Sequence, residues 1–324
     1  MRRILGNRKL QIALNGGFAV LLLGVMALGG RRFAHNGFAL RHADPLLAGA
    51  ATLLFLAAYA FKAWGWQRLF AADDRPGASA LAFAGGAACV GGVALPGRLD
   101  DALRIACVKR FPGVRTQLGA VALSLVVLGL LDNVALAPLS AVAAVHASSW
   151  TVRATFALVA FAGILAAALV ASLPTVARRT FVMRFRVGRW LASNTHCNRR
   201  AAAALAFISV SWALRGTAVF LLLDALSMRS SFPLALAFLC ASAASAALPI
   251  APAGAATQAG AGSAILIASG VHAGEAIAFA VAAQVLVVGT GAIVLLLVAG
   301  WHLATHHPRT SRHTSARTVA PAAS

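Results

Sequence analysis

The stretch AGGAACVGGVALPGRLDDALRIACVKR, from Ala84 to Arg110, decides how the rest of the chain is interpreted. Small residues fill its first part, which ends at Leu95-Pro96-Gly97, and the sequence then becomes strongly charged. Its first part is too rich in small residues for an ordinary lipid-facing span. Its end is too polar to cross a bilayer. The stretch therefore predicts a broken helix that enters the membrane without crossing it.

A second stretch, LAFLCASAASAALPIAPAGAATQAGAG from Leu236 to Gly262, has the same form: LAF, small residues, then Leu-Pro. We predict two re-entrant hairpins, at 77–111 and 232–272. Paired broken helices are a common way to build a binding site inside a membrane. Non-helical backbone at membrane depth is tolerated only where protein or water covers it, so both hairpins are expected inside the helix bundle.

The chain has 324 residues, of which 60% are hydrophobic and 11% charged, as in a polytopic membrane protein. Six stretches have the roughly 20 apolar residues that a span needs: 11–30, 46–66, 116–137, 153–174, 201–223 and 276–300. We predict an all-α integral membrane protein with one membrane domain, 11–301. Its halves cover 11–137 and 153–300. A cytoplasmic segment, 1–10, precedes the domain, and a disordered basic and His-containing tail, 302–324, follows it.

The net charge of +20 is interpreted first as topology, because cytoplasmic loops of membrane proteins accumulate Lys and Arg. If both hairpins are re-entrant, most of the 28 Lys and Arg residues, including those of the arginine-rich segment 175–200, lie on the side of both termini. This predicts a multi-pass inner-membrane protein with cytoplasmic termini and no nucleic-acid partner. The hairpins then open from opposite faces, which is an inverted repeat.

At LPGRLDDALRIACVKR the chain resembles the transmembrane region of the lysylphosphatidylglycerol synthase family, and LPIAPAGAATQAG and GEAIAFAVAAQVL resemble later parts of that region. The resemblance runs from about Lys62 to Gly300. Ala253 and Ala259 depart from the family pattern, which has glycine and an acid or second glutamine there. The residues that match the two hairpin motifs are Pro96, Gly97, Arg98, Arg104, Pro249, Pro252, Gly254, Thr257 and Gln258.

The resemblance implies the lipid-handling membrane half of such synthases, as a stand-alone, flippase-like member without the soluble synthase domain. The leading interpretation is a protein that binds and translocates a lipid or similar amphiphile. A second interpretation is a membrane partner that presents a lipid to a separately encoded lipid or glycosyl transferase. A third is a structural membrane protein without transport.

Ionisable residues within spans are costly and therefore candidates for function. Arg215 lies mid-span, Asp132 toward the outer end of the third span, and Glu275 at the start of the last span. A buried Asp132–Arg215 pair would offset much of the cost of both charges. The alternatives are ordinary: Asp132 reaches outer water, Arg215 snorkels to the interface, and Glu275 begins a helix.

The basic residues after the first turn, Arg98, Arg104, Lys109 and Arg110, have the chemistry to hold a phosphate, so an anionic or phosphate-bearing lipid head group is the expected partner. No catalytic motif is present, and no enzyme activity, cofactor or metal is expected. Asp132 and Glu275 are candidate polar partners of the site. The candidate substrate-binding residues are Pro96, Gly97, Arg98, Arg104, Arg215, Pro249, Pro252, Gly254, Thr257 and Gln258.

Overall fold

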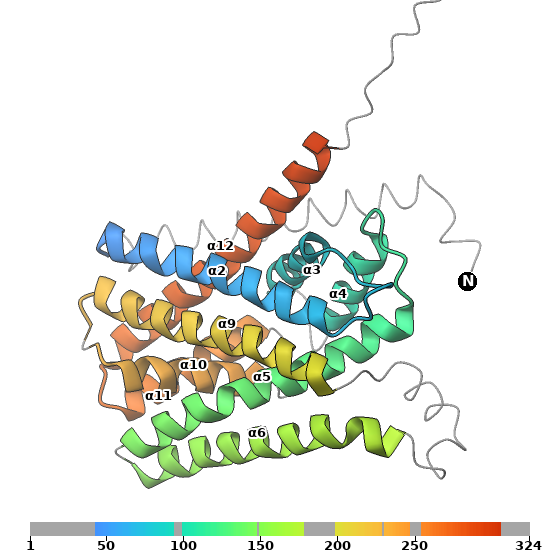
Figure 1. The fold of residues 1–324 in the computed structure, drawn as a ribbon. Helices are drawn as coiled ribbons and strands as arrows, with labels where there is room; N and C mark the ends of the chain where they lie inside the picture. The colour runs from blue at the N-terminus through green and yellow to red at the C-terminus, as the bar shows by residue number, and fades with distance from the viewer. Residues whose placement is uncertain are drawn as a thin grey trace, which may run out of the picture.

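The structure, a computed structural model, describes residues 43–93, 99–147, 149–177, 198–228, 230–246 and 254–305. Within these ranges all regular structure is helical, which confirms the predicted fold class (Figure 1). The helices are α2 (Pro45–Arg68), α3 (Ala78–Gly91), α4 (Leu99–Arg110), α5 (Leu118–His146), α6 (Trp150–Ala177), α9 (Asn198–Ala225), α10 (Phe232–Ala246), α11 (Gly254–Ala268) and α12 (Ala273–Thr305). The predicted span 11–30 lies outside the described residues.

In the described part of the chain, five helices are long and apolar enough to cross a membrane: α2, α5, α6, α9 and α12. They correspond to five of the predicted spans, but the expected end of the third span is wrong. The third span was expected to end at 137, and α5 instead continues through Pro138 to His146. Likewise α6 passes through Pro174. Proline is tolerated inside membrane helices because neighbouring groups and local adjustments satisfy the backbone that it frees.

Each predicted hairpin consists of two short helices that pack against each other, α3 with α4 and α10 with α11. The 14 residues of α3 give a length of about 21 Å at 1.5 Å per residue. This is shorter than the hydrocarbon core of a bilayer, which is about 30 Å thick. A helix of that length does not cross alone, which agrees with the predicted re-entrant hairpin.

The long helices α2 and α9 lie side by side and run antiparallel (Figure 1). At one end, the Asp44 amide before α2 donates to the Ala225 carbonyl of α9 at 2.9 Å. Farther along, the Ser211 hydroxyl donates to the Ala58 carbonyl at 2.8 Å. Toward the other end, Gly65 allows close approach, because a Cβ there would lie 2.9 Å from Ile208 Cγ1.

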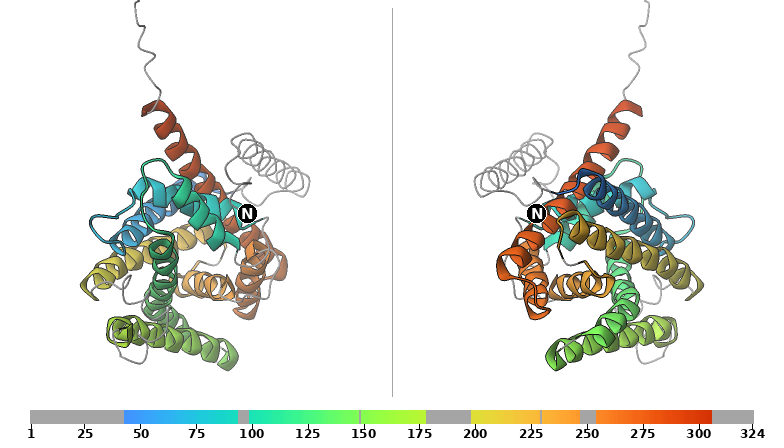
Figure 2. Two further views of the ribbon diagram at one scale, coloured as in Figure 1. Left: turned by 90° about the vertical axis from the view of Figure 1, so that its right-hand side faces the viewer. Right: turned by 90° about the vertical axis from the view of Figure 1, so that its left-hand side faces the viewer.

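The contacts between helices have a two-fold pattern. Exchanging α2 with α9, α3 with α10, α4 with α11 and α5 with α12 turns the α3–α12 contact into the α10–α5 contact. The same exchange turns the α2–α3 and α4–α5 contacts into the α9–α10 and α11–α12 contacts. Because the equivalent helices α2 and α9 are antiparallel, the two halves are inverted relative to each other. Among the described helices α6 has no counterpart in this exchange, and Figure 2 shows it at the periphery beside α5.

Small residues bring the halves close together where α3 meets α12. A Cβ on Gly86 would lie 2.6 Å from the carbonyl oxygen of Gly291, and a Cβ on Gly291 would lie 3.0 Å from Cys89 Cβ. The Cys89 thiol also donates to the Val287 carbonyl at 3.6 Å. The small residues that made the first hairpin unusual in the sequence therefore pack its first helix against a spanning helix of the other half.

Candidate functional site

A cavity of about 290 Å³ lies between the two halves of the fold. Both hairpins and all four of the spanning helices in the two-fold pattern contribute to its wall, whereas α6 does not. We call it the central cavity. Its volume is at the lower end of the range for small-molecule sites. The polar side chains that line it are Tyr59, Lys62, Trp66, Cys89, Asp100, Arg104, Trp212, Arg215, Ser242, Ser245, Thr257, Gln258 and Gln284.

Four of the residues predicted from sequence meet in the central cavity: Arg104 from α4, Arg215 from α9, and Thr257 and Gln258 from α11. Arg104, Arg215 and the neighbouring Thr257 and Gln258 come from distant parts of the chain and meet because α4, α9 and α11 all line the cavity. Gly254 begins α11. Glu275 is exposed in the first turn of α12 and is not part of the cavity wall, so it is the helix-start residue of the alternative interpretation. The turn residues Pro96, Gly97, Arg98, Pro249 and Pro252 lie outside the described residues.

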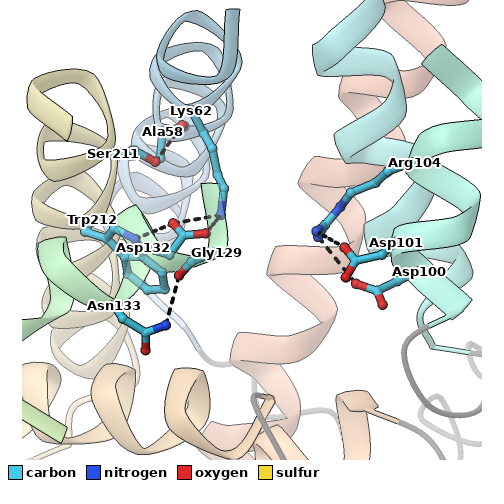
Figure 3. Close-up of polar contacts among 10 residues, drawn as sticks. All are labelled: Ala58, Lys62, Asp100, Asp101, Arg104, Gly129, Asp132, Asn133, Ser211 and Trp212. Atoms are coloured by element: carbon cyan, nitrogen blue, oxygen red, sulfur yellow. Dashed lines mark hydrogen bonds and ion pairs between the residues drawn. The ribbon is translucent and has the colours of Figure 1, made fainter. Parts of the chain in front are cut away.

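The pairing expected for Asp132 is wrong. Its carboxylate accepts from Lys62 Nζ at 2.8 and 3.0 Å and from Trp212 Nε1 at 2.8 Å (Figure 3). Among the described residues its ion pair is with Lys62 and not with Arg215. The side chains of Lys62 and Asp132 are only 21% and 20% exposed. Asp132 also lies near the middle of α5 and not at an outer end, because the helix continues to His146. Three helices are joined by this cluster: α2, α5 and α9.

Arg215 lies instead between two aromatic side chains. Its guanidinium carbon is 5.0 Å from the Trp212 ring centroid and 5.7 Å from that of Tyr59, distances at which a cation is attracted to a π-face. Its Nε is buried and has no hydrogen-bond partner among the described residues. No described carboxylate pairs with it. A buried donor without a partner is costly, so the guanidinium has unused capacity for an acceptor.

Arg104 has partners of its own on α4. Its guanidinium lies 2.8 Å from the Asp101 carboxylate and 3.5 Å from that of Asp100 (Figure 3). These acids lie in the first turn of α4, where their negative charge interacts favourably with the positive end of the helix dipole. Lys109, in the last turn, donates to the Thr116 carbonyl at 2.7 Å and does not line the cavity. Of the three cations in the described cavity wall, Arg215 alone has no acidic partner among the described residues.

The second hairpin and α12 supply amide groups to the same cavity. Gln284 donates from Nε2 to Gln258 Oε1 at 3.2 Å, and the Ser242 hydroxyl donates to the Gln258 backbone carbonyl at 3.1 Å. Amides and hydroxyls can donate to or accept from a ligand, so this wall suits a hydroxylated or phosphate-bearing head group. Among the described residues, no group of three or more His, Cys, Asp or Glu side chains is placed to hold a metal ion.

Sequence reasoning did not select three side chains that shape the site: Tyr59, Lys62 and Trp212. Lys62 carried a usable signal, since a lysine within an apolar span needs a partner. The aromatic residues carried none, because tyrosine and tryptophan are ordinary in membrane helices. Their role follows only from the antiparallel contact that brings α2 and α9 together.

Comparison with known proteins agrees with this architecture. No curated protein and no solved structure gave a significant match to the chain. A family model described as lysylphosphatidylglycerol synthase TM region matches residues 12–309, which is nearly the whole sequence. The match includes both hairpins, all the described helices and the central cavity. The chain is therefore an all-α, multi-pass membrane protein that belongs to the lysylphosphatidylglycerol synthase transmembrane-region family.

Proposed function

We propose that this protein binds the polar head group of a membrane lipid or similar amphiphile in the central cavity and moves it across the bilayer. The observation that carries the proposal is the composition of the cavity wall: a cation from the first hairpin, an amide from the second, and further cations and an amide from the spanning helices surround one space. Inverted repeats with broken helices at a shared site are the architecture of many transporters. The family, which is related to lipid metabolism, supports a lipid as the ligand.

The volume of the cavity suits a head group and not a whole lipid, because about 290 Å³ leaves no room for two acyl chains. The chains would remain in the surrounding membrane. We assign Arg104 and Arg215 to an anionic or phosphate-bearing head group, and Thr257 and Gln258 to its hydroxyl or ester oxygens. In this proposal these residues bind the head group while it is moved across the membrane, and no covalent bond is made or broken.

The positions of the basic residues suggest an orientation. Arg68, Arg75, Arg115, Arg199 and Arg200 lie at or near the helix ends that meet where α2 ends and α9 begins. At the opposite end, Arg153 is the one arginine or lysine among the described residues. By the positive-inside rule we place the first end in the cytoplasm and the protein in an inner membrane.

The test is translocation of a fluorescent anionic lipid in proteoliposomes. Vesicles contain tail-labelled phosphatidylglycerol, and dithionite bleaches the label in the outer leaflet. With the wild-type protein, we expect bleaching of the inner-leaflet pool to be faster than in empty vesicles, and the double variant Arg104→Ala, Arg215→Ala should lose the increase. Bleaching no faster than in empty vesicles would contradict translocation. If the protein still binds lipid in that case, the presentation of lipid to a transferase becomes the better account.

A further inference from the structure

The two halves repeat one short element at a fixed offset along the chain. Ala58 and Ser211, which are hydrogen-bonded across the α2–α9 contact, are separated by 153 residues. The same offset relates Tyr59 to Trp212 and Lys62 to Arg215. It also relates Pro96 to Pro249, the prolines of the two hairpin stretches. Each half therefore contributes an aromatic residue followed three positions later by a cation.

These repeated side chains meet at the contact between the halves. Lys62 Nζ lies 5.7 Å from the Trp212 ring centroid, and the Arg215 guanidinium carbon lies 5.7 Å from that of Tyr59. Each cation thus reaches the aromatic residue of the opposite half. All four side chains line the central cavity. If the halves were chemically identical, both cations would have equivalent surroundings.

The surroundings of Lys62 and Arg215 differ in one negative charge, which, among the described residues, only Lys62 has beside it. Lys62 is neutralised by Asp132 of α5, which also accepts from Trp212. At the offset of 153 residues, the position in α12 that corresponds to Asp132 is Val285. The residues around it, 283–287, contain no acid. Gln284 supplies an amide to the cavity from that part of α12. The repeat therefore provides an internal counterion for Lys62 and none for Arg215 within the described structure.

We propose that Arg215, and not its repeat counterpart Lys62, binds the anionic group of the ligand, and that this group is an oxyanion such as a phosphodiester. The proposal rests on the proposed function and names its anion-binding residue. A guanidinium presents several donors in one plane, which suits two oxygens of one phosphate. The Arg215 Nε is buried without a hydrogen-bond partner among the described residues, so Arg215 gains more from a ligand anion than a lysine that already has a carboxylate.

Lipid retention by the purified protein tests this assignment. The wild-type protein is incubated in detergent with equal amounts of phosphatidylglycerol and an uncharged monoglucosyl diacylglycerol with the same acyl chains, and native mass spectrometry measures the bound lipid. We expect preferential retention of phosphatidylglycerol. Arg215→Gln should reduce that preference by about tenfold or more, as expected for loss of a charge-assisted hydrogen bond. Arg215→Lys should keep part of it.

Two controls separate this site from general charge effects. The double variant Lys62→Gln, Asp132→Asn removes both members of the neutral pair, so its loss of preference should be smaller than that of Arg215→Gln. Arg153→Gln removes an exposed arginine outside the cavity wall, whose guanidinium donates to the Ala147 carbonyl, and it should keep the wild-type preference. If Arg215→Gln folds poorly, Gln284→Glu places a carboxylate in the same cavity and should lower retention of phosphatidylglycerol while leaving Arg215 in place.

The assignment is overturned if Arg215→Gln keeps the wild-type preference for phosphatidylglycerol or, where that variant does not fold, if Gln284→Glu keeps it. It is also overturned if the Lys62, Asp132 double variant loses as much of this preference as Arg215→Gln does. Competition by deacylated phosphatidylglycerol identifies the source of the oxyanion. Displacement supports a site for the head group alone, whereas no displacement supports a site that also needs the acyl chains. Retention without translocation in vesicles would contradict the proposed transport and keep the Arg215 assignment. Normal translocation by Arg215→Gln would overturn the Arg215 assignment alone.

Discussion

Lys62 Nζ lies 2.8 Å from Oδ2 of Asp132, so a charge on α2 is neutralised by a carboxylate 70 residues away on α5. The indole of Trp212 on α9 donates to the other oxygen of the same carboxylate at 2.8 Å. This cluster ties both halves together at the wall of the central cavity.

The first prediction concerns the stability of this cluster. Asp132→Asn or Lys62→Gln alone should destabilise the protein by about 3–5 kcal/mol, because each leaves a charge without its partner in a largely buried place. The double variant should be more stable than either single variant, since no charge is left unpaired. Thermal unfolding in detergent, compared across the three variants, measures this. A double variant whose losses simply add would show that the pair is not coupled.

The second prediction tests the contact between the first hairpin and α12. Gly291→Cys would place its Cβ 3.0 Å from the Cβ of Cys89, slightly closer than in a relaxed disulfide, so a small shift allows a bond. Under mild oxidation we expect a disulfide between Cys89 and the new cysteine, detected by mass spectrometry of peptides. If the halves rock during transport, the bond should also stop translocation, and a reductant should restore it.

The control for this disulfide is Gly289→Cys, two residues away on the same helix. A Cβ at Gly289 meets no atom within 4 Å, so no bond to Cys89 is expected. Equal cross-linking of both variants would mean that the α3–α12 contact is not held in the arrangement described.

The third prediction uses the close approach at Gly86. Gly86→Ala would push a methyl group to 2.6 Å from the Gly291 carbonyl oxygen, which is backbone and cannot move aside easily. We expect a loss of about 1–3 kcal/mol, the usual cost of overpacking. Gly289→Ala has open space and should be neutral or slightly stabilising. Unfolding midpoints of the two variants in the same detergent decide the matter, and equal midpoints would contradict the packing.

The fourth prediction concerns topology. Arg75 follows α2, whereas Ser269 follows α11, and both are exposed at opposite ends of the bundle. In a background without the four native cysteines, Ser269→Cys should react with an impermeant maleimide in intact cells. Arg75→Cys should react only after the membrane is opened. Labelling of both from the same side would contradict the inverted arrangement of the hairpins.

The broken hairpins were predictable because their signal is local. Runs of small residues followed by Leu95-Pro96 and Leu248-Pro249 cannot form ordinary lipid-facing spans, whatever surrounds them. The helix ends were less predictable. The third span was predicted to end at 137, just before Pro138, yet α5 continues past this proline, because tertiary surroundings decide whether a proline ends a membrane helix.

The members of the cavity wall were only partly predictable. Arg104, Arg215, Thr257 and Gln258 were selected from charge and family resemblance, and the structure brings them together. The partner of Asp132 was not predictable, because a uniformly apolar helix gives no sign of which face meets which neighbour. Lys62 and Arg215 are similarly placed in their spans, and only the fold determines which of them the acid reaches.

In the proposed complex, an anionic head group occupies the cavity between the inverted halves and contacts Arg215. The most direct measurement is a cryo-electron microscopy structure of the protein in nanodiscs that contain phosphatidylglycerol. We expect head-group density in the central cavity, with phosphate oxygens within hydrogen-bond distance, about 3 Å, of the Arg215 guanidinium. A cavity closed by side chains, or a lipid phosphate bound away from Arg215 while that residue pairs with an acid of the protein, would contradict it.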